Sequence, residues 1–327
     1  MTEIIEIGTA IAKPGTIVEG KIIVEKLAGG ENISMPVTII NGSKPGPCFW
    51  INGGIHGDEP EGILTCSLLK KEINPSNLTG SIVMIPAMNV PAMEAAQRGN
   101  PLDTFSYDMN RIYPGREDGY LSERIAYVHK EWMVKFADME ISIHSGGSHS
   151  YLAEAMFAAK DEKTQELARA MGEDWKVCLY SNITSKSPMA VMSEIGKPAL
   201  TVELGGRSST APGAFLNVGK KLLKACVNIL KHYKMIDGDP HYPSVRYKGY
   251  QKALLAPKSG VFLPNPDVKF LNMMKKNDHI ATIIDYQGSE LCKLLAPEDG
   301  MFFGLRALPN VTIGDWCCFY AIIEGEW

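Results

Sequence analysis

The chain has 327 residues, of which 45% are hydrophobic and 21% are charged. This composition excludes intrinsic disorder, and the length favours two domains or one large α/β domain with an appended unit. The net charge is −4 and no long basic run is present, so nucleic acid is not an expected partner.

Signals for a membrane or for secretion are not visible in the sequence. The apolar window 81–93 is shorter than the roughly 20 residues that a membrane helix needs, and it contains two prolines. The N-terminal residues lack the basic region and apolar stretch of a signal peptide, which indicates a cytoplasmic protein. Seven cysteines occur without CxxC spacing, so we expect buried thiols rather than disulfides or zinc ligands.

The first three quarters of the chain alternate between strand and helix patterns after a β-rich entry at 16–41. Buried strands are predicted at 47–52, 81–88, 139–145 and 198–204. Helices are predicted at 60–73, 121–136, 162–172 and 217–236, the last ending at Gly238. The alternation predicts an α/β fold with a central sheet covered by helices.

A proline- and glycine-rich segment, 237–244, interrupts this pattern and predicts a domain boundary near residue 240. The chain then becomes β-rich, which predicts a larger domain at 1–240 and a smaller all-β domain at 241–327. LLAPKSGVF at 254–262 is echoed by LLAPEDGMF at 294–302. This echo indicates a small sandwich or barrel with two related halves, or merely two similar Pro-x-x-Gly turns.

Common nucleotide and hydrolase motifs are absent or incomplete. The segment 15–22 matches GxxxxGK but ends in isoleucine where a phosphate loop needs a hydroxyl for magnesium. No GxSxG elbow occurs, and no GxGxxG follows a strand. The chemistry must therefore come from other residues.

A first candidate site is 52–62, where a strand should end and a helix begin. It carries His56 and Glu59 among three glycines, which would allow a tight turn to direct both side chains at a metal such as zinc. A solvated turn without a metal is the alternative, because this spacing also arises by chance. His144 ends another predicted strand and could supply a third ligand, although a histidine that closes a strand is more often a structural residue bonded to backbone.

Glu203 is an acid within an apolar strand that is followed by two glycines. Burial of a carboxylate costs several kcal/mol unless it is paired. A general base beside a metal explains this position, and so does a buried ion pair with an arginine. Arg98, Asn110 and Arg111 are candidates for binding a carboxylate or an oxyanion, although loop arginines are usually just solvated.

Four segments in order, 53–62, 89–115, 144–147 and 202–206, resemble the succinylglutamate desuccinylase and aspartoacylase family, which is related to zinc carboxypeptidases. The resemblance spans about residues 45 to 210. Within the family, 108–126 and 144–147 are most similar to the branch that includes N-acetyl-diaminobutyrate deacetylases of ectoine breakdown.

This resemblance implies a central mixed sheet flanked by helices, with an added C-terminal β domain that has a packing or lid role. It implies that zinc, one ion per chain, is bound by His56, Glu59 and His144. Glu203 would be the catalytic acid and base, and Arg98 would polarise the scissile carbonyl.

The same resemblance implies that Asn110 and Arg111 bind the substrate carboxylate. Arg207 and Arg116 are further candidates for substrate contact. One departure concerns Ser142, because many relatives have aspartate two residues before the second histidine; a supporting role for this position is therefore in doubt.

The function implied is zinc-dependent hydrolysis of the amide bond of a small N-acyl amino acid. A metallocarboxypeptidase acting on short peptides is one alternative, and a non-catalytic binding protein that retains the fold is another. A homo-oligomer is compatible with the sequence, and the acyl group is not identifiable from it.

Overall fold

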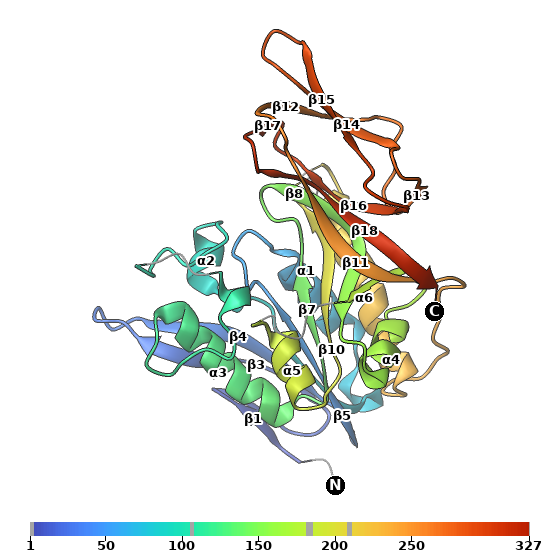
Figure 1. The fold of residues 1–327 in the computed structure, drawn as a ribbon. Coiled ribbons are helices and arrows are strands. Elements are labelled where there is room, and N and C mark those ends of the chain that lie inside the picture. Colours follow the sequence, from blue (N-terminus) through green and yellow to red (C-terminus); the bar gives the residue numbers. More distant parts are fainter. Residues whose placement is uncertain (1–2, 105–107, 181–185, 208–210, 327) are drawn as a thin grey trace.

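The computed structural model describes residues 3–104, 108–180, 186–207 and 211–326. Its main feature is a mixed twelve-stranded sheet with the order β13-β16-β18-β11-β9-β8-β10-β7-β5-β6-β4-β3. Helices lie on both faces of this sheet, and a separate four-stranded sheet, formed by strands from the C-terminal part of the chain, lies at one end of the molecule (Figure 1). The predicted mixed sheet with flanking helices is confirmed.

The elements up to the middle of the chain form the β-rich entry and the first half of the sheet. The strands are β1 (Ile5–Ile7), β2 (Ala10–Ala12), β3 (Thr16–Lys26), β4 (Asn32–Asn41), β5 (Lys44–Gly53), β6 (Thr79–Ile85) and β7 (Met139–His144). The helices are α1 (Glu61–Glu72), α2 (Val90–Glu94) and α3 (Leu121–Phe136), with short 3-10 turns at Pro75–Asn77 and Met109–Arg111.

The second half completes the sheet and adds the C-terminal strands. The helices are α4 (Glu162–Ala170), α5 (Pro188–Glu194) and α6 (Ala214–His232). The strands are β8 (Ser150–Ala158), β9 (Val177–Tyr180), β10 (Ala199–Gly206), β11 (Tyr247–Leu255), β12 (Gly260–Pro264), β13 (Met273–Met274), β14 (His279–Ile284), β15 (Glu290–Leu295), β16 (Gly300–Arg306), β17 (Asn310–Val311) and β18 (Trp316–Glu326).

Two hydrophobic cores hold the helices against opposite faces of the sheet. The larger core joins α1, α4 and α6 to one face, and the second joins α3 and α5 to the other. The central strands are therefore buried on both faces, as expected for parallel strands covered by helices.

Most predicted elements agree with the structure, and the differences lie at their ends. The helix predicted at 121–136 is confirmed as α3. The strand predicted at 81–88 ends at Ile85, directly before Pro86. The prediction that the last helix continues to residue 236 and ends at Gly238 is wrong, because α6 ends at His232 and Lys234 adopts a left-handed φ of 55°.

The strands after residue 240 extend the central sheet. β11 pairs in parallel with β9, and β16 pairs antiparallel with β8. The other C-terminal strands, β15, β14, β12 and β17, form the four-stranded sheet, and a third core fills the space between the two layers. These two layers form a small sandwich; the domain boundary near residue 240 stays a prediction.

The two copies of the internal echo occupy equivalent strand–turn–strand positions. Residues 254–262 lead from β11 in the large sheet to β12 in the small one, and 294–302 lead from β15 in the small sheet to β16 in the large one. The copies therefore connect the same two layers in opposite directions, which agrees with two related halves.

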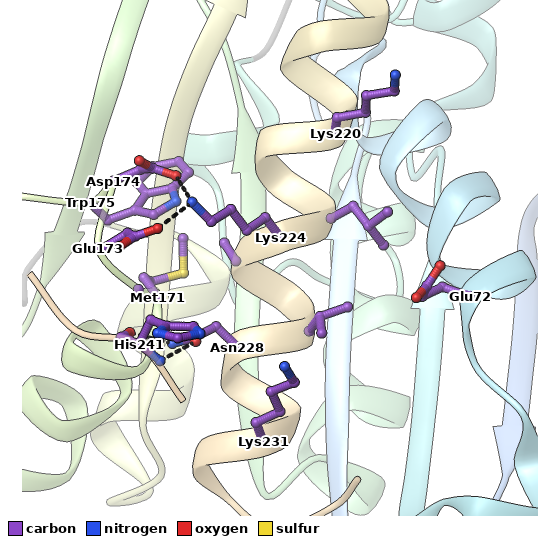
Figure 2. A pocket seen from close by; sticks show the side chains of 14 residues that line it. Glu72, Met171, Glu173, Asp174, Trp175, Lys220, Lys224, Asn228, Lys231 and His241 are labelled. Carbon is purple, nitrogen blue, oxygen red and sulfur yellow. Dashed lines mark hydrogen bonds and ion pairs between the residues drawn. The ribbon is translucent and has the colours of Figure 1, made fainter. Parts of the chain in front are cut away.

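A hollow of about 260 Å³ lies beside α6 (Figure 2). Contacts among the residues that line it hold the segment before β11. Asn228 of α6 donates to the backbone oxygens of Ala170 and His241, each at 2.9 Å, and its oxygen accepts from the His241 N–H at 2.7 Å. Lys224 in the same hollow pairs with Glu173 and Asp174. The bonds with His241 fasten the boundary segment to α6, and the other contacts fasten the end of α4 and the residues after it to the same helix.

Candidate functional site

The turn between β5 and α1 positions His56 and Glu59. Both side chains are buried, with 2% and 3% exposure. The turn passes so close to α2 that a Cβ atom on Gly57 would lie 2.0 Å from the backbone carbonyl of Ala92, and only glycine fits there. The glycines of this turn thus allow the backbone to bring both side chains to the edge of the sheet.

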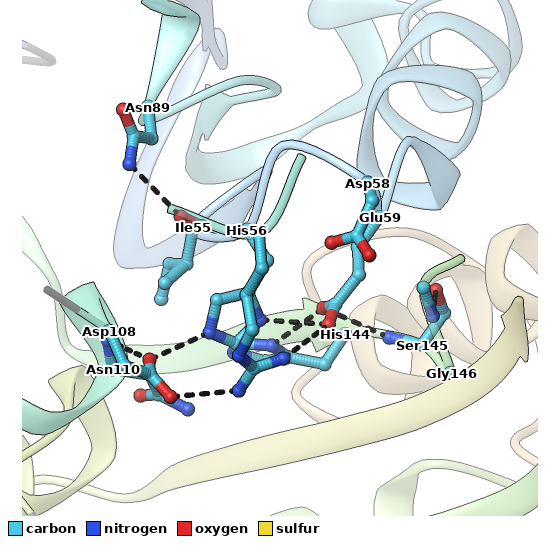
Figure 3. A network of polar contacts seen from close by, with 12 residues as sticks. Ile55, His56, Asp58, Glu59, Asn89, Asp108, Asn110, His144, Ser145 and Gly146 are labelled. Atoms are coloured by element: carbon cyan, nitrogen blue, oxygen red, sulfur yellow. Dashed lines mark hydrogen bonds and ion pairs between the residues drawn. The ribbon is translucent and has the colours of Figure 1, made fainter. Parts of the chain in front are cut away.

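His144 ends β7 at the same edge and completes a three-residue cluster (Figure 3). The Nδ1 atoms of His56 and His144 lie 2.8 and 2.9 Å from the two carboxylate oxygens of Glu59. One ligand atom from each residue lies within 4.8 Å of the others. The structure therefore brings together the three residues that the sequence analysis singled out as metal ligands, while their role as ligands stays a prediction.

The second nitrogen of each imidazole has its own partner. Nε2 of His56 lies 2.9 Å from Asp108 Oδ1, and Nε2 of His144 lies 3.3 Å from Ser142 Oγ. The Ser142 hydroxyl already donates its proton to Asn52 Oδ1 at 2.7 Å. It must therefore accept from His144, so that His144 Nε2 carries the proton and Nδ1 presents a lone pair.

The charges of the cluster agree with a site for a cation. Burial opposes ionisation of Glu59, but the two imidazoles outweigh it and lower the pKa of this carboxyl. Burial also opposes protonation of His56, yet Glu59 and Asp108 raise its pKa to about 9. Burial lowers the pKa of His144. A neutral His144 thus directs a lone pair at a carboxylate, an arrangement that a shared cation stabilises.

A row of buried polar side chains continues behind His144. Glu140, Ser142 and His144 alternate along β7 and therefore point to the same face. Asn52, opposite Ser142 on β5, donates to Glu140 Oε1 at 2.6 Å. Burial raises the pKa of Glu140 to about 8 although Asn52 opposes this shift. Asn52 and Glu140 were not predicted from the sequence; for Glu140, the alternation of polar residues along 140–144 was the available signal.

Glu203 lies beside this cluster because of strand register. It pairs directly with His144 across the parallel strands β10 and β7. Its side chain lines the same cavity as the three cluster residues and is partly exposed there. Oε2 has no hydrogen-bond partner among the described residues. Burial and the nearby Glu59 charge raise the pKa of Glu203 well above its usual value, an effect that a bound cation would oppose.

Arg98 and Asp108 form the opposite side of the cluster. Arg98 donates to Asp108 Oδ2 at 2.9 Å and to Glu59 Oε1 at 3.5 Å. Its side chain is 51% exposed, so the guanidinium reaches solvent as well as the cluster. Asp108 therefore links His56 to Arg98. It was not predicted from the sequence, although it lies only two residues before the predicted Asn110.

The other predicted substrate residues are placed differently. Asn110 and Arg111 line the cavity of the cluster. Arg207 lines a neighbouring groove with Gly147 and Ser148, and it donates to the Ser148 carbonyl at 3.3 Å. Arg116 is exposed and pairs with Asp118. Arg207 and Arg116 are thus not brought together with the cluster, and their contact with substrate remains a prediction.

The cavity of the cluster has a volume of about 430 Å³. The polar residues described above line part of it. Further lining residues that were not predicted from the sequence include Leu152, Phe157, Gln251, Phe303, Trp316 and Phe319. Most of them come from the C-terminal strands, whose position in the sheet cannot be derived from residue spacing.

Comparison with known proteins places this site in a family. The model for the succinylglutamate desuccinylase/aspartoacylase catalytic domain matches residues 45–231, which is more than half of the chain. The chain belongs to this family. The resemblance inferred from the sequence motifs is thereby confirmed.

Individual relatives agree with this membership. The chain is 27% identical over 300 residues to an N-alpha-acetyl-L-2,4-diaminobutyric acid deacetylase of Halomonas elongata, covering 86% of this chain and 84% of that protein. A succinylglutamate desuccinylase from Silicibacter sp. TM1040 superposes with a TM-score of 0.82 at 21% identity, covering 97% of this chain and 98% of that chain.

A second solved structure is the product-bound ectoine utilization protein EutE (DoeB) from Ruegeria pomeroyi. It gives a TM-score of 0.80 at 22% identity and covers 94% of this chain and 95% of that chain. These two structural likenesses show a shared fold. Separately, none of the helices in the described part of the chain has the length and apolarity needed to cross a lipid bilayer.

The Ser142 hydrogen bond predicts an effect on metal affinity. Ser142→Ala removes the acceptor that keeps the proton on His144 Nε2, and loss of such a supporting contact typically weakens metal binding about 10- to 100-fold. Ser142→Thr keeps the hydroxyl and should restore affinity. Competition with a chromophoric chelator for zinc measures the effect.

A matched control is Ser193→Ala, which removes a buried hydroxyl of α5 that has no hydrogen-bond partner among the described residues. This variant should bind zinc as the parent protein does. Equal zinc affinity of Ser142→Ala and the parent would show that Ser142 does not orient His144.

Proposed function

We propose that this protein is a zinc-dependent amidohydrolase that removes the acyl group from a small N-acyl amino acid. The observation that carries the proposal is the convergence of His56, Glu59 and His144 in one cavity with Glu203. Membership in the succinylglutamate desuccinylase/aspartoacylase family supports the reaction class, since both enzymes in the family name are deacylases.

The residues of the cluster fit a catalytic zinc ion. Two imidazole nitrogens and a carboxylate make three protein ligands, which leave a fourth position for water or substrate. Asp108 and Ser142 hold the other imidazole nitrogens and orient the rings, as is usual for zinc ligands. A zinc ion there would lower the pKa of water to about 7 and polarise an acyl carbonyl.

Glu203 is the proposed general base and acid. Its side chain lines the cavity next to His144, and its buried Oε2 atom has no hydrogen-bond partner among the described residues. It would accept a proton from the attacking water and later deliver it to the nitrogen of the departing amine. The amide C–N bond then breaks, and the products are a carboxylic acid and an amino acid.

The arginines are assigned to the two negatively charged parts of the substrate. Arg98 reaches the cluster and would stabilise negative charge on the carbonyl oxygen as water adds. Arg111 and Asn110, which line the same cavity, would bind the substrate carboxylate. The carboxypeptidase alternative would use the same residues but needs room for a peptide; a cavity of about 430 Å³ walled by C-terminal strands favours a small substrate.

Purified protein tests the proposal directly. Loaded with one zinc per chain, it should release amine from a panel of N-acetyl, N-succinyl and N-formyl amino acids. Removal of the metal with a chelator should abolish the release, and added zinc or cobalt should restore it.

The same assay distinguishes the alternatives. Release of C-terminal residues from short peptides, with no hydrolysis of the N-acyl amino acids, would support a carboxypeptidase. Substoichiometric zinc and no hydrolysis after addition of zinc or cobalt would support a non-catalytic binding protein.

If Glu203 is the general base, its replacement should slow the reaction without loss of zinc. Glu203→Gln keeps the size of the side chain but cannot accept the proton, so kcat should fall about 100- to 10,000-fold while the zinc content stays the same. The matched control is Glu154→Gln, which alters a buried carboxylate of β8 that pairs with Lys221. Unchanged kcat in Glu203→Gln would remove this residue from the mechanism.

If Arg98 stabilises the carbonyl oxygen, its removal should also lower kcat, although for a different reason than the removal of Glu203. Arg98→Ala removes a fixed cation from the carbonyl oxygen and should lower kcat by about 100- to 1,000-fold, with a smaller change in KM. Arg116→Ala, at an exposed residue paired with Asp118, is the control and should match the parent. If Arg98→Ala instead raises only KM, Arg98 binds the substrate carboxylate rather than the reacting carbonyl.

A further inference from the structure

The cavity of the cluster has an aromatic wall. We use this name for Phe157 of β8, Phe303 of β16, and Trp316 and Phe319 of β18, all of which line the cavity. The rings of Trp316 and Phe319 stack with centroids 4.2 Å apart and an interplanar angle of 14°. Phe303 stacks on Phe319 at 6.1 Å. The wall is thus a packed aromatic surface.

The part of the cavity that is lined by the C-terminal strands carries no charged side chain. Among the described residues, those after Glu203 that line the cavity are Gln251, Phe303, Trp316 and Phe319, and none of them is charged. The residues that the structure does not describe include no lysine, arginine, aspartate or glutamate.

Asp58 also lines the cavity, and Ser148 holds its carboxylate. Its Oδ2 accepts hydrogen bonds from the backbone N–H and the hydroxyl of Ser148, both at 2.9 Å, while its Oδ1 is buried and has no hydrogen-bond partner among the described residues. The carboxylates of Glu59 and Glu203 have roles in the proposed reaction. A substrate group that extends toward the aromatic wall therefore meets rings and the neutral amide of Gln251.

We infer that the aromatic wall is a subsite for an apolar group of aromatic size on the N-acyl amino acid. This inference rests on the proposed function and names its substrate class. An ammonium or carboxylate placed at the wall would lose water without gaining an ion pair, which is costly. An apolar group gains free energy from the same burial and can stack on the rings.

Two parts of the substrate can supply such a group. The amino-acid side chain and the acyl chain both extend from the amide bond that reacts at the cluster, and either can reach the wall. The shared chemistry is an apolar group linked to the scissile amide, and substrates that carry it on one side or the other distinguish the two sources.

The test compares kcat/KM on zinc-loaded protein for five substrates. N-acetyl-L-phenylalanine and N-benzoyl-L-alanine place the ring on the side chain and on the acyl group, and N-acetyl-L-alanine is the reference. N-acetyl-L-2,4-diaminobutyrate and N-acetyl-L-aspartate carry opposite charges. At least one aromatic substrate should exceed alanine and both charged substrates by about tenfold or more.

Variants of the wall connect this preference to its residues. Trp316→Ala should reduce the ratio of kcat/KM between the preferred aromatic substrate and N-acetyl-L-alanine by about tenfold, and Trp316→Phe should retain most of it. This ratio does not depend on the fraction of active protein, so partial misfolding does not affect it. Tyr286→Ala, at an aromatic residue that is 82% exposed, is the control and should keep the parent ratio.

The outcomes separate this inference from the proposed function. A preference for the diaminobutyrate or aspartate substrate, or a ratio unchanged by Trp316→Ala, would overturn the aromatic subsite while leaving the deacylase intact. Absence of hydrolysis across a broad panel of N-acyl amino acids in the presence of zinc would overturn both.

Discussion

The site depends on the register of three parallel strands, β5, β7 and β10. Their pairing sets Asn52 beside Ser142, and His144 beside Glu203. Because side chains alternate between the faces of a strand, a slip of one residue would turn the polar row into the hydrophobic core and bring apolar side chains to the site. The two helix-covered cores hold this register, and so the packing of the fold also determines the geometry of the site.

Hydrogen bonds to the Nε2 atoms orient the two imidazole rings. Asp108 and Ser142 occupy the Nε2 atoms, which leaves the Nδ1 atoms directed at Glu59. Ser142 supports His144 with a neutral hydroxyl that is joined to Asn52 and, through it, to Glu140. This chain of hydrogen bonds ends in a fully buried carboxyl whose pKa is raised to about 8.

The sequence predicted those parts of the site that local patterns encode. His56, Glu59, His144 and Glu203 each follow or end a short apolar run, and open α/β sheets gather such positions at one edge. Asp108 was missed because its partners, His56 and Arg98, lie 52 and 10 residues away along the chain. The aromatic wall was missed for a related reason: it depends on which edge of the sheet receives the C-terminal strands, and residue spacing carries no information on long-range pairing.

The continuity of the large sheet bears on how substrate enters the cavity. β16 pairs with β8 from Gly304 to Arg306, and β11 pairs with β9 from Tyr247 to Gly249. If the C-terminal strands opened and closed as a lid, these backbone hydrogen bonds would have to break at every turnover. The C-terminal strands therefore form a fixed rim of the cavity, so that the shape of the cavity on this side does not depend on the opening and closing of a domain.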